Sequence, residues 1–71
     1  MDIDLRQLRY VAAVEEHGTY TRAAEALGVS QPTLSRSVQS LEAALGTPVF
    51  DRTRNGVIPT AVGRIVLERA A

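Results

Sequence analysis

The sequence has no cysteine, no lysine and no long apolar run. Without cysteine, the chain cannot form disulfides, thiolate zinc sites or cysteine nucleophiles. Its longest apolar stretches, Val11–Val14 and Ile65–Leu67, are far short of the roughly 20 residues that span a bilayer. The N-terminus carries Asp2 and Asp4, where a secretory signal would be basic. We therefore expect a cytoplasmic protein that has no contact with a membrane.

Length and charge restrict the classes of function further. The chain has 71 residues, of which 45% are hydrophobic, so it fits one small domain without internal repeats. Eight arginines balance eight acidic residues, so the net charge does not indicate a nucleic-acid partner. The charges are unevenly divided, however. Residues 1–29 hold three arginines and five acids, whereas residues 30–71 hold five arginines and three acids, so the C-terminal part is positive.

Capping residues and helical periodicity predict two helices in the first part of the chain. Asp4 stands three residues before Gln7, as in a capping box, and an apolar periodic stretch follows up to Gly18, which predicts a helix over 5–17. Thr19 is a second N-cap candidate. It precedes apolar residues at helical spacing, and Gly28 supplies a C-terminal stop, which predicts a short helix over 20–27.

A third helix is expected over 31–45. Ser30 is its N-cap candidate, and Pro32 lies in the first turn, where a missing N–H costs little. One narrow stripe of the helix is apolar, and the opposite face is left free. The stripe consists of Leu34, Val38, Leu41 and Leu45, and the free face of Pro32, Arg36, Gln39, Ser40 and Ala43.

The last part of the chain predicts a hairpin followed by a helix. Val49-Phe50 and Val57-Ile58 flank a segment with an Asn-Gly turn signal and two arginines, Arg52 and Arg54. Pro59 should end the hairpin. Thr60 can cap a fourth helix that continues to Ala71. The expected fold is mainly α, with a three-helix core and a small β-hairpin.

The second and third helices have the spacing of a helix-turn-helix, whose second helix enters the DNA major groove. Small residues such as Ala23 and Ala24 would also serve an ordinary helix pair, so spacing alone leaves both interpretations open. A hairpin with Arg52 and Arg54 could follow the DNA backbone or minor groove, or could simply be a solvated turn. The polar free face of the third helix favours DNA recognition.

The pattern as a whole resembles the N-terminal winged helix-turn-helix domain of LysR-type transcriptional regulators. The resemblance covers Leu5 to Gly63 and rests on short motifs that are common singly but unusual together. The matching residues are Leu5-Arg6-Gln7-Leu8-Arg9-Tyr10, Gly18, Thr21-Arg22-Ala23-Ala24, Leu27, Val29-Ser30-Gln31-Pro32, Leu34-Ser35-Arg36, Leu41-Glu42, Leu45-Gly46, Phe50, Arg52, Thr60 and Gly63. The sequence departs from the family pattern at Val11 and Tyr20, where Phe is usual, and at Pro59, where Leu is usual.

The resemblance implies sequence-specific binding to double-stranded DNA at a pseudo-palindromic site. The recognition helix, about 31–45, would lie in the major groove, and the wing at 52–56 on the backbone or minor groove. Gln31 could pair with adenine, and Arg36 with guanine or a phosphate. The implied DNA-binding residues are Ser30, Gln31, Pro32, Thr33, Ser35, Arg36, Gln39, Arg52 and Arg54.

The resemblance also implies a homodimer held through the fourth helix. The candidate dimerisation residues are Val62, Ile65, Val66 and Leu67. Residues 1–59 would then form the DNA-binding domain, and residues 60–71 the start of a linker and dimerisation helix. A small-molecule effector would bind a larger domain following that helix, which these 71 residues do not include.

Catalytic functions find little support in the sequence. The single histidine, His17, stands at a predicted helix C-terminus beside Glu15 and Glu16 and has no second histidine or cysteine with which to hold a metal. No glycine-rich phosphate loop follows a strand. We expect no enzyme activity, no metal and no cofactor. The alternative to DNA binding is a winged helix that binds another protein, which the zero net charge favours.

Overall fold

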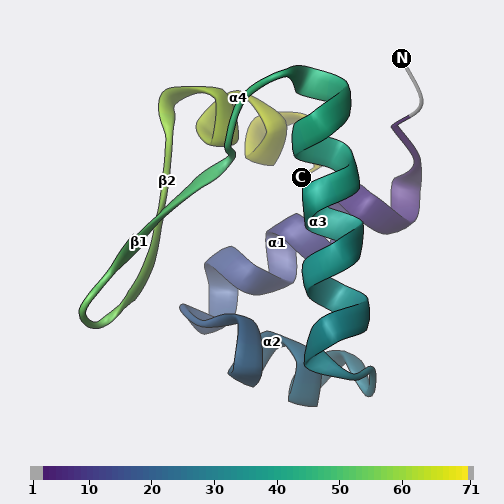
Figure 1. Cartoon of the computed structure of the whole chain (residues 1–71), viewed down its shortest axis with the longest axis vertical. Helices are drawn as coiled ribbons and strands as arrows, with labels where there is room; N and C mark the ends of the chain where they lie inside the picture. The colour runs from purple at the N-terminus through teal and green to yellow at the C-terminus, as the bar shows by residue number, and fades with distance from the viewer. Residues whose placement is uncertain (1–2, 71) are drawn as a thin grey trace.

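Residues 3–70 form four helices and one hairpin, in the order expected from the sequence (Figure 1). The computed structural model describes residues 3–70. The elements are α1 Leu5–His17, α2 Tyr20–Leu27, α3 Gln31–Leu45, β1 Phe50–Thr53, β2 Gly56–Pro59 and α4 Ala61–Ala70. The predicted bounds of the first three helices are confirmed. The fourth was expected to reach Ala71, which lies outside the described residues.

Side-chain caps fix the start of each of the first three helices. The Asp4 carboxylate accepts a hydrogen bond from the Gln7 backbone N–H at 2.8 Å, and the Gln7 side chain accepts one from the Asp4 N–H, so the predicted capping box is present. The Thr19 hydroxyl accepts from the Arg22 N–H at 3.1 Å. Gly28 ends α2 with φ 72°, a left-handed conformation that glycine adopts without strain.

The core lies where α3 crosses α1 and α2. The predicted stripe of α3 is confirmed at Leu34, Val38 and Leu41, which are completely buried. They pack with buried residues of the other elements, namely Val11, Val14, Tyr20, Ala23, Ala24, Val49, Phe50 and Val66. The small side chains of Ala23 and Ala24 let α2 approach its neighbours closely. The orientation of α3 is therefore fixed by apolar burial.

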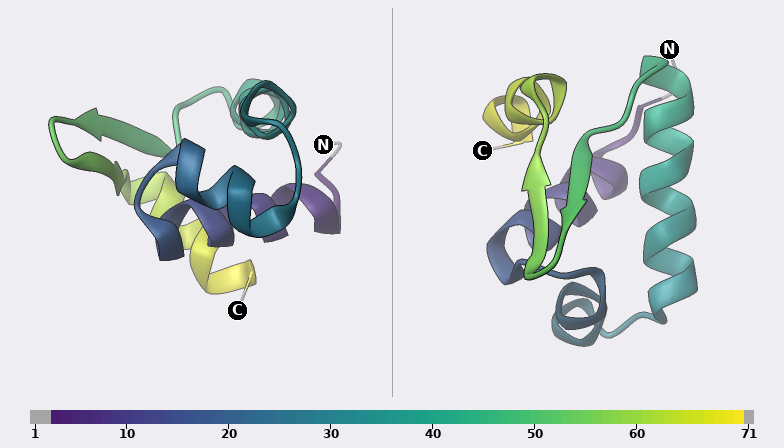
Figure 2. Two further views of the ribbon diagram at one scale, coloured as in Figure 1. Left: turned by 90° about the horizontal axis from the view of Figure 1, so that it is seen from below. Right: turned by 60° about the vertical axis from the view of Figure 1, so that its left-hand side comes forward.

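The hairpin is longer and more tightly turned than predicted. Its strands pair antiparallel from Phe50 opposite Pro59 to Thr53 opposite Gly56, which leaves only residues 54–55 as the loop. The expected strands at Val49-Phe50 and Val57-Ile58 were thus too short. Val49 is a buried core residue before β1 instead. The Asn-Gly signal lies at the end of the loop, because Asn55 is a loop residue and Gly56, with φ 141°, begins β2. Figure 2 shows the hairpin projecting beyond the helices as a wing.

A group of hydrogen bonds connects the end of α3, the loop before β1 and the start of α4. The Val49 N–H donates to the Glu42 carboxylate at 2.8 Å, and the Val49 carbonyl accepts from the Thr60 N–H at 2.9 Å. Thr60 caps α4 by accepting from the Gly63 N–H, and its hydroxyl donates to the Pro48 carbonyl. Gly63 lies so close to the Val49 carbonyl that a Cβ there would overlap it. α4 is therefore attached to the core through this loop.

None of the helices in residues 3–70 combines the length and apolar character needed to cross a membrane.

Candidate nucleic-acid interface

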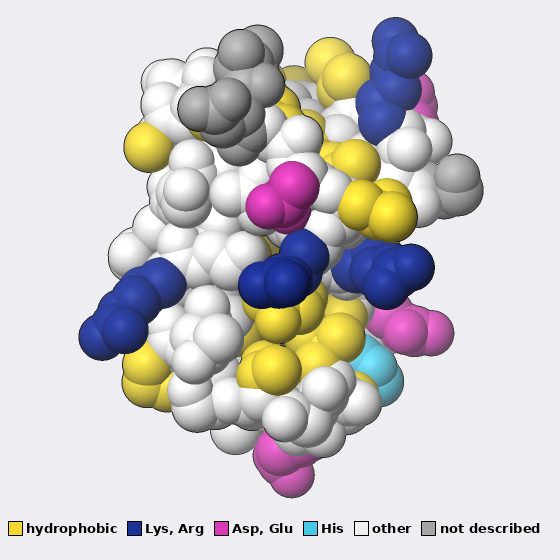
Figure 3. Space-filling view, turned by 90° about the vertical axis from the view of Figure 1, so that its right-hand side faces the viewer, with side chains coloured by type: hydrophobic (Ala, Val, Ile, Leu, Met, Phe, Trp, Pro, Cys, Tyr) yellow, Lys and Arg dark blue, Asp and Glu magenta, His cyan; other side chains and the backbone are white. Residues whose placement is uncertain are grey.

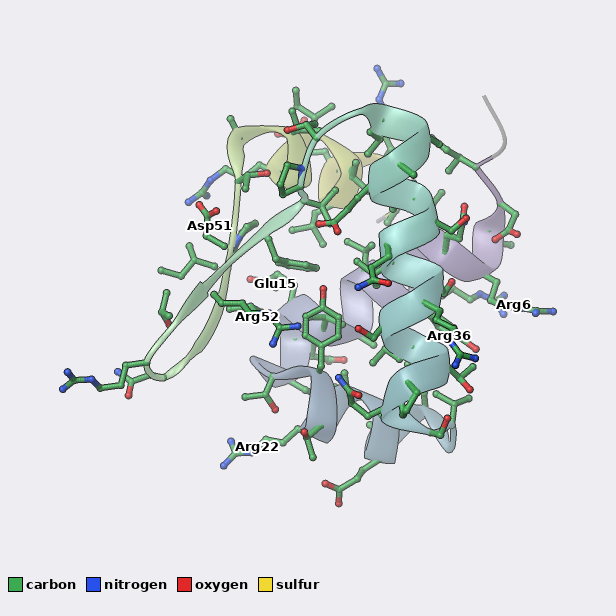
Figure 4. All side chains as sticks on the ribbon, in the orientation of Figure 1. Arg6, Glu15, Arg22, Arg36, Asp51 and Arg52 are labelled. Carbon is green, nitrogen blue, oxygen red and sulfur yellow. The ribbon has the colours of Figure 1, made fainter. Side chains whose placement is uncertain are left out.

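The outward face of α3 carries most of the sequence-predicted contact residues. Pro32, Arg36 and Gln39 are exposed, because they lie opposite the buried stripe. Figure 4 shows Arg36 standing out from α3. Ser35 is only half-buried, at the edge of this face. The helix therefore presents one guanidinium and several uncharged polar groups, the combination that reads base edges in a major groove.

The first turn of α3 is organised by two hydroxyls. The Ser30 Oγ accepts from the Thr33 N–H at 3.2 Å and lies 2.7 Å from the Thr33 hydroxyl oxygen. Both residues are exposed. This mutual contact holds the two hydroxyls in place at the helix N-terminus, where the backbone N–H groups favour a negatively charged ligand.

Backbone contacts hold the wing against the turn between α1 and α2. The Val57 N–H donates to the Gly18 carbonyl at 2.9 Å. At the same point Gly56 has φ 141°, and a Cβ on it would overlap the Gly18 carbonyl oxygen. The Thr53 hydroxyl donates to the Gly56 carbonyl at 3.1 Å, which closes the hairpin loop. Glycine at position 56 thus permits the approach that sets the direction of the wing.

Arg52 and Arg54 occupy different positions on the wing. Arg54 is an exposed loop residue. Arg52 belongs to β1, and its guanidinium carbon lies 5.0 Å from the centroid of the Tyr20 ring, a cation–π arrangement. The same ring packs edge-to-face against Phe50, with the ring centroids 6.3 Å apart. Figure 4 shows Arg52 reaching from β1 back toward the helices.

An open cleft of about 350 Å³ lies between the start of α2, the start of α3 and the wing. It is lined by Thr19, Tyr20, Thr21, Gln31, Arg52, Thr53, Arg54, Asn55, Gly56 and Val57. Three of the predicted contact residues, Gln31, Arg52 and Arg54, therefore meet around one hollow although they are up to 23 positions apart in the sequence. The others, on α3 and its cap, lie outside the lining of this cleft.

The electrostatics of this region are set by few charges. α3 and the wing together carry the cations Arg36, Arg52 and Arg54 and the acids Glu42 and Asp51. The Glu42 carboxylate is engaged by the Val49 N–H, at the far end of α3 from the cleft. Burial raises the pKa of Tyr20 above its usual value; the Glu42 charge adds to this shift and the Arg52 charge opposes it. Tyr20 is therefore a neutral aromatic ring at physiological pH.

Other arginines lie away from the cleft. Figure 4 places Arg6 on the side of the molecule opposite the wing, and Arg22 on α2. Figure 3 shows that arginines and acidic residues are mixed with apolar side chains on the face turned away from the wing. The positive charge of the domain is thus dispersed, and the cleft owes its character to the two wing arginines.

The four residues predicted for dimerisation lie in different environments on α4. Ile65 is 57% exposed, whereas Val66 is 7% exposed and belongs to the core of this chain. Val62 and Leu67 are half-buried and pack against that core. Val66 therefore packs in the core of its own chain and is not accessible to a partner. Ile65 is the most accessible of the four.

Two contributors to the site were missed by sequence reasoning. Gly56 was interpreted only as part of a turn signal, and Tyr20 only as a departure from the family pattern at a position where Phe is usual. Their roles depend on partners far away in sequence, the Gly18 carbonyl and Arg52. A lone tyrosine or glycine gives no local signal of such contacts.

Comparison with known proteins identifies the family. Residues 5–64 match the sequence pattern described as "Bacterial regulatory helix-turn-helix protein, lysR family". The chain belongs to the LysR family. Among curated LysR-like relatives, it is 57% identical over 67 residues to the SDS degradation transcriptional activation protein of Pseudomonas sp., with 94% of this chain and 22% of that protein aligned. It is 49% identical over 70 residues to the small neutral protease regulatory protein of Streptomyces coelicolor, with 99% and 21% aligned.

Solved structures confirm the LysR winged-helix fold. The complex of the CbnR DNA-binding domain with DNA matches with a TM-score of 0.89 and 44% identity, over 96% of this chain and 78% of that one. The BenM DNA-binding domain bound to catB site 1 DNA matches with a TM-score of 0.88 and 40% identity, over 96% and 73%. The chain spans about a fifth of the length of the curated relatives described above.

Proposed function

We propose that this chain is the DNA-binding part of a LysR-type transcription regulator and binds double-stranded DNA in a sequence-specific manner. The observation that carries the proposal is the meeting of the wing arginines and the start of α3 around one open cleft. Two proteins of the same fold, CbnR and BenM, have been solved with DNA. This function requires no catalytic group and places the protein in the bacterial cytoplasm, where the DNA is.

The exposed face of α3 would read base edges in the major groove. Gln31 and Arg36 have the side chains suited to adenine and to guanine or a phosphate, respectively, and Thr33, Ser35 and Gln39 add smaller polar contacts. Ser30 and Pro32 would order the first turn, which faces a phosphate. Arg52 and Arg54 would contact the backbone or the narrow minor groove, so they would contribute affinity that depends little on sequence.

Two copies would bind a pseudo-palindromic site, with half-sites about one helical turn apart. The exposed Ile65 supports a pairing surface on α4, with Val62 and Leu67 at its margin. Sedimentation of the chain over a range of concentrations tests this step. We expect a concentration-dependent dimer that Ile65→Lys weakens, and a wild-type chain that is monomeric at all concentrations would contradict pairing within these 71 residues.

The experiment that tests the DNA-binding proposal is selection from a random duplex pool at two salt concentrations, followed by sequencing of the retained DNA. We expect an enriched motif with twofold symmetry and an affinity that falls steeply with salt, because bound arginines release counterions from the phosphates. Arg36→Ala should weaken retention, whereas Arg6→Ala, which removes an arginine of α1 and not of the proposed recognition helix, serves as the matched control. If no duplex is retained even at low salt, the proposal is wrong for this chain.

A further inference from the structure

The Tyr20 ring has a feature that its place in the core does not require, because a cation covers one of its faces. Tyr20 is only 9% exposed and lies at the first position of α2, directly after the Thr19 cap. Phe50 packs against the ring edge-to-face, and the Arg52 guanidinium lies over its face. The ring therefore links the helical core to the wing.

The register of β1 explains why Arg52 reaches this ring. Successive side chains of a strand alternate between its faces, so Phe50 and Arg52 share one face and Asp51 takes the other. Phe50 is buried against the helices, which turns Arg52 toward them as well. Within residues 3–70, no carboxylate lies within 4.0 Å of Arg52. The aromatic ring, and not an ion pair, holds the guanidinium among the described residues.

We propose that Tyr20 is a positioning residue for DNA binding, which holds the Arg52 guanidinium over its ring at the lining of the cleft, where the guanidinium binds a backbone phosphate. The attraction between the ring and the cation does not use up the five N–H donors of the guanidinium, so Arg52 can contact the ring and a phosphate at once. This inference rests on the proposed function, because it assigns a DNA phosphate as the group that Arg52 binds.

The physical gain is preorganisation. An unrestrained arginine loses rotamer freedom when it binds a phosphate, and a side chain already held in place loses less. The neutral ring offers its negative face to the cation, and no carboxylate of residues 3–70 forms an ion pair with Arg52, so its positive charge is left for the ligand. A phenylalanine ring would hold Arg52 equally well, whereas an aliphatic side chain of similar size would fill the core without attracting the cation.

The test compares Tyr20→Phe, Tyr20→Leu and Arg52→Gln with the wild-type chain. Dissociation constants are measured by fluorescence anisotropy on the selected duplex and on a scrambled duplex. We expect Tyr20→Phe to match the wild type, and Tyr20→Leu to raise Kd by about two- to five-fold on both duplexes, the factor that corresponds to an exposed cation–π contact. In the Arg52→Gln background, Tyr20→Leu should have no further effect. An equal loss in both backgrounds, or no loss at all, would overturn the inference.

Proton NMR supplies a readout that a purely structural role would not give. In the wild type, the δ-methylene protons of Arg52 should be shifted upfield by the Tyr20 ring current, and the shift should persist in Tyr20→Phe and in the DNA complex. Random-coil positions for these protons would overturn the inference even if Tyr20→Leu failed to fold. A wild-type chain that binds no duplex would refute the proposed function and this inference together, whereas wild-type binding that is unaltered in Tyr20→Leu would refute this inference alone.

Discussion

The two elements that face the proposed DNA site, α3 and the wing, are fixed by different kinds of interaction. α3 is oriented by a stripe of completely buried apolar side chains, Leu34, Val38 and Leu41. The wing is oriented by backbone and ring contacts, from Val57 and Gly56 to the Gly18 carbonyl and from Arg52 to Tyr20. Apolar burial is strong but non-directional, whereas a close backbone contact fixes one direction of approach. The reading helix and the wing should therefore respond differently to mutation.

Leu34→Ala tests the α3 half of this comparison and should have the largest effect. Leu34 is completely buried, so its truncation should lower the free energy of unfolding by about 2–5 kcal/mol through lost burial and a cavity. In a domain of this size that is a large fraction of the total stability. Urea unfolding followed by circular dichroism measures the change. The matched control is Leu5→Ala, because Leu5 is 63% exposed and should cost far less. Equal midpoints for the two variants would contradict the role given to the stripe.

Gly56→Ala tests the wing half. A Cβ at this position would overlap the Gly18 carbonyl oxygen, and the backbone is in a region that disfavours alanine, so we expect a cost of about 1–3 kcal/mol or a displaced wing. Hydrogen exchange of the Val57 amide, which is bound to Gly18, distinguishes these outcomes. The matched control is Gly46→Ala. That site also has a positive φ but open space around it, so only the conformational cost of about 1–2 kcal/mol applies. The close approach would have little influence on the wing if Gly56→Ala met two conditions. The Val57 amide would remain as protected from hydrogen exchange as in the wild type, and the loss in free energy of unfolding would be no greater than that of Gly46→Ala.

Arg36→Ala and Arg54→Ala sharpen the comparison at the level of DNA binding. Arg36 stands on the reading helix, so its loss should cost about 1–3 kcal/mol of binding free energy and relax the preference at one base position. Arg54 stands in the wing loop, so its loss should weaken all sequences alike and reduce the slope of log K against log salt by about one unit. Affinities on selected and scrambled duplexes at several salt concentrations provide both readouts. If both variants lost base preference equally, the division between reading helix and wing would be wrong.

The difference between α3 and the wing also explains which parts of the fold could be predicted from the sequence. The helix bounds followed from caps and periodicity within a few residues, as with Asp4 and Gln7, or Ser30 ahead of the Leu34 stripe. The strands were predicted too short because only the apolar residues of the hairpin were assigned to them, and the direction of the wing could not be predicted because it depends on the distant Gly18 carbonyl. Glu42 matched a family motif, but nothing in the sequence indicated that its carboxylate binds the Val49 N–H.

The candidate site was predicted to a similar extent. The exposed polar residues of α3 followed from helical geometry once the stripe was recognised. The cleft that brings Gln31 together with the wing arginines needed the fold. On α4, periodicity identified apolar residues but could not separate Val66, which the protomer's own core buries, from the exposed Ile65. Which face of a short terminal helix is free depends on how its first turn is tied down, here by Thr60 and the Pro48 carbonyl.

The smallest expected effect is the pH dependence of stability that Tyr20 causes, the residue that links the helical core to the wing. Burial raises the pKa of Tyr20 above 10.0, so the folded state favours the protonated phenol relative to the unfolded chain. This contribution to stability is fully present below about pH 10 and is lost as the pH rises through the folded pKa. Urea midpoints should therefore fall above pH 10 in the wild type and fall less in Tyr20→Phe, with the two proteins similar near pH 7. Tyr10→Phe is the matched control and should retain the Tyr20-dependent fall. If Tyr20→Phe lost stability as steeply as the wild type at high pH, the ring would not be buried between the core and the wing as the structure has it.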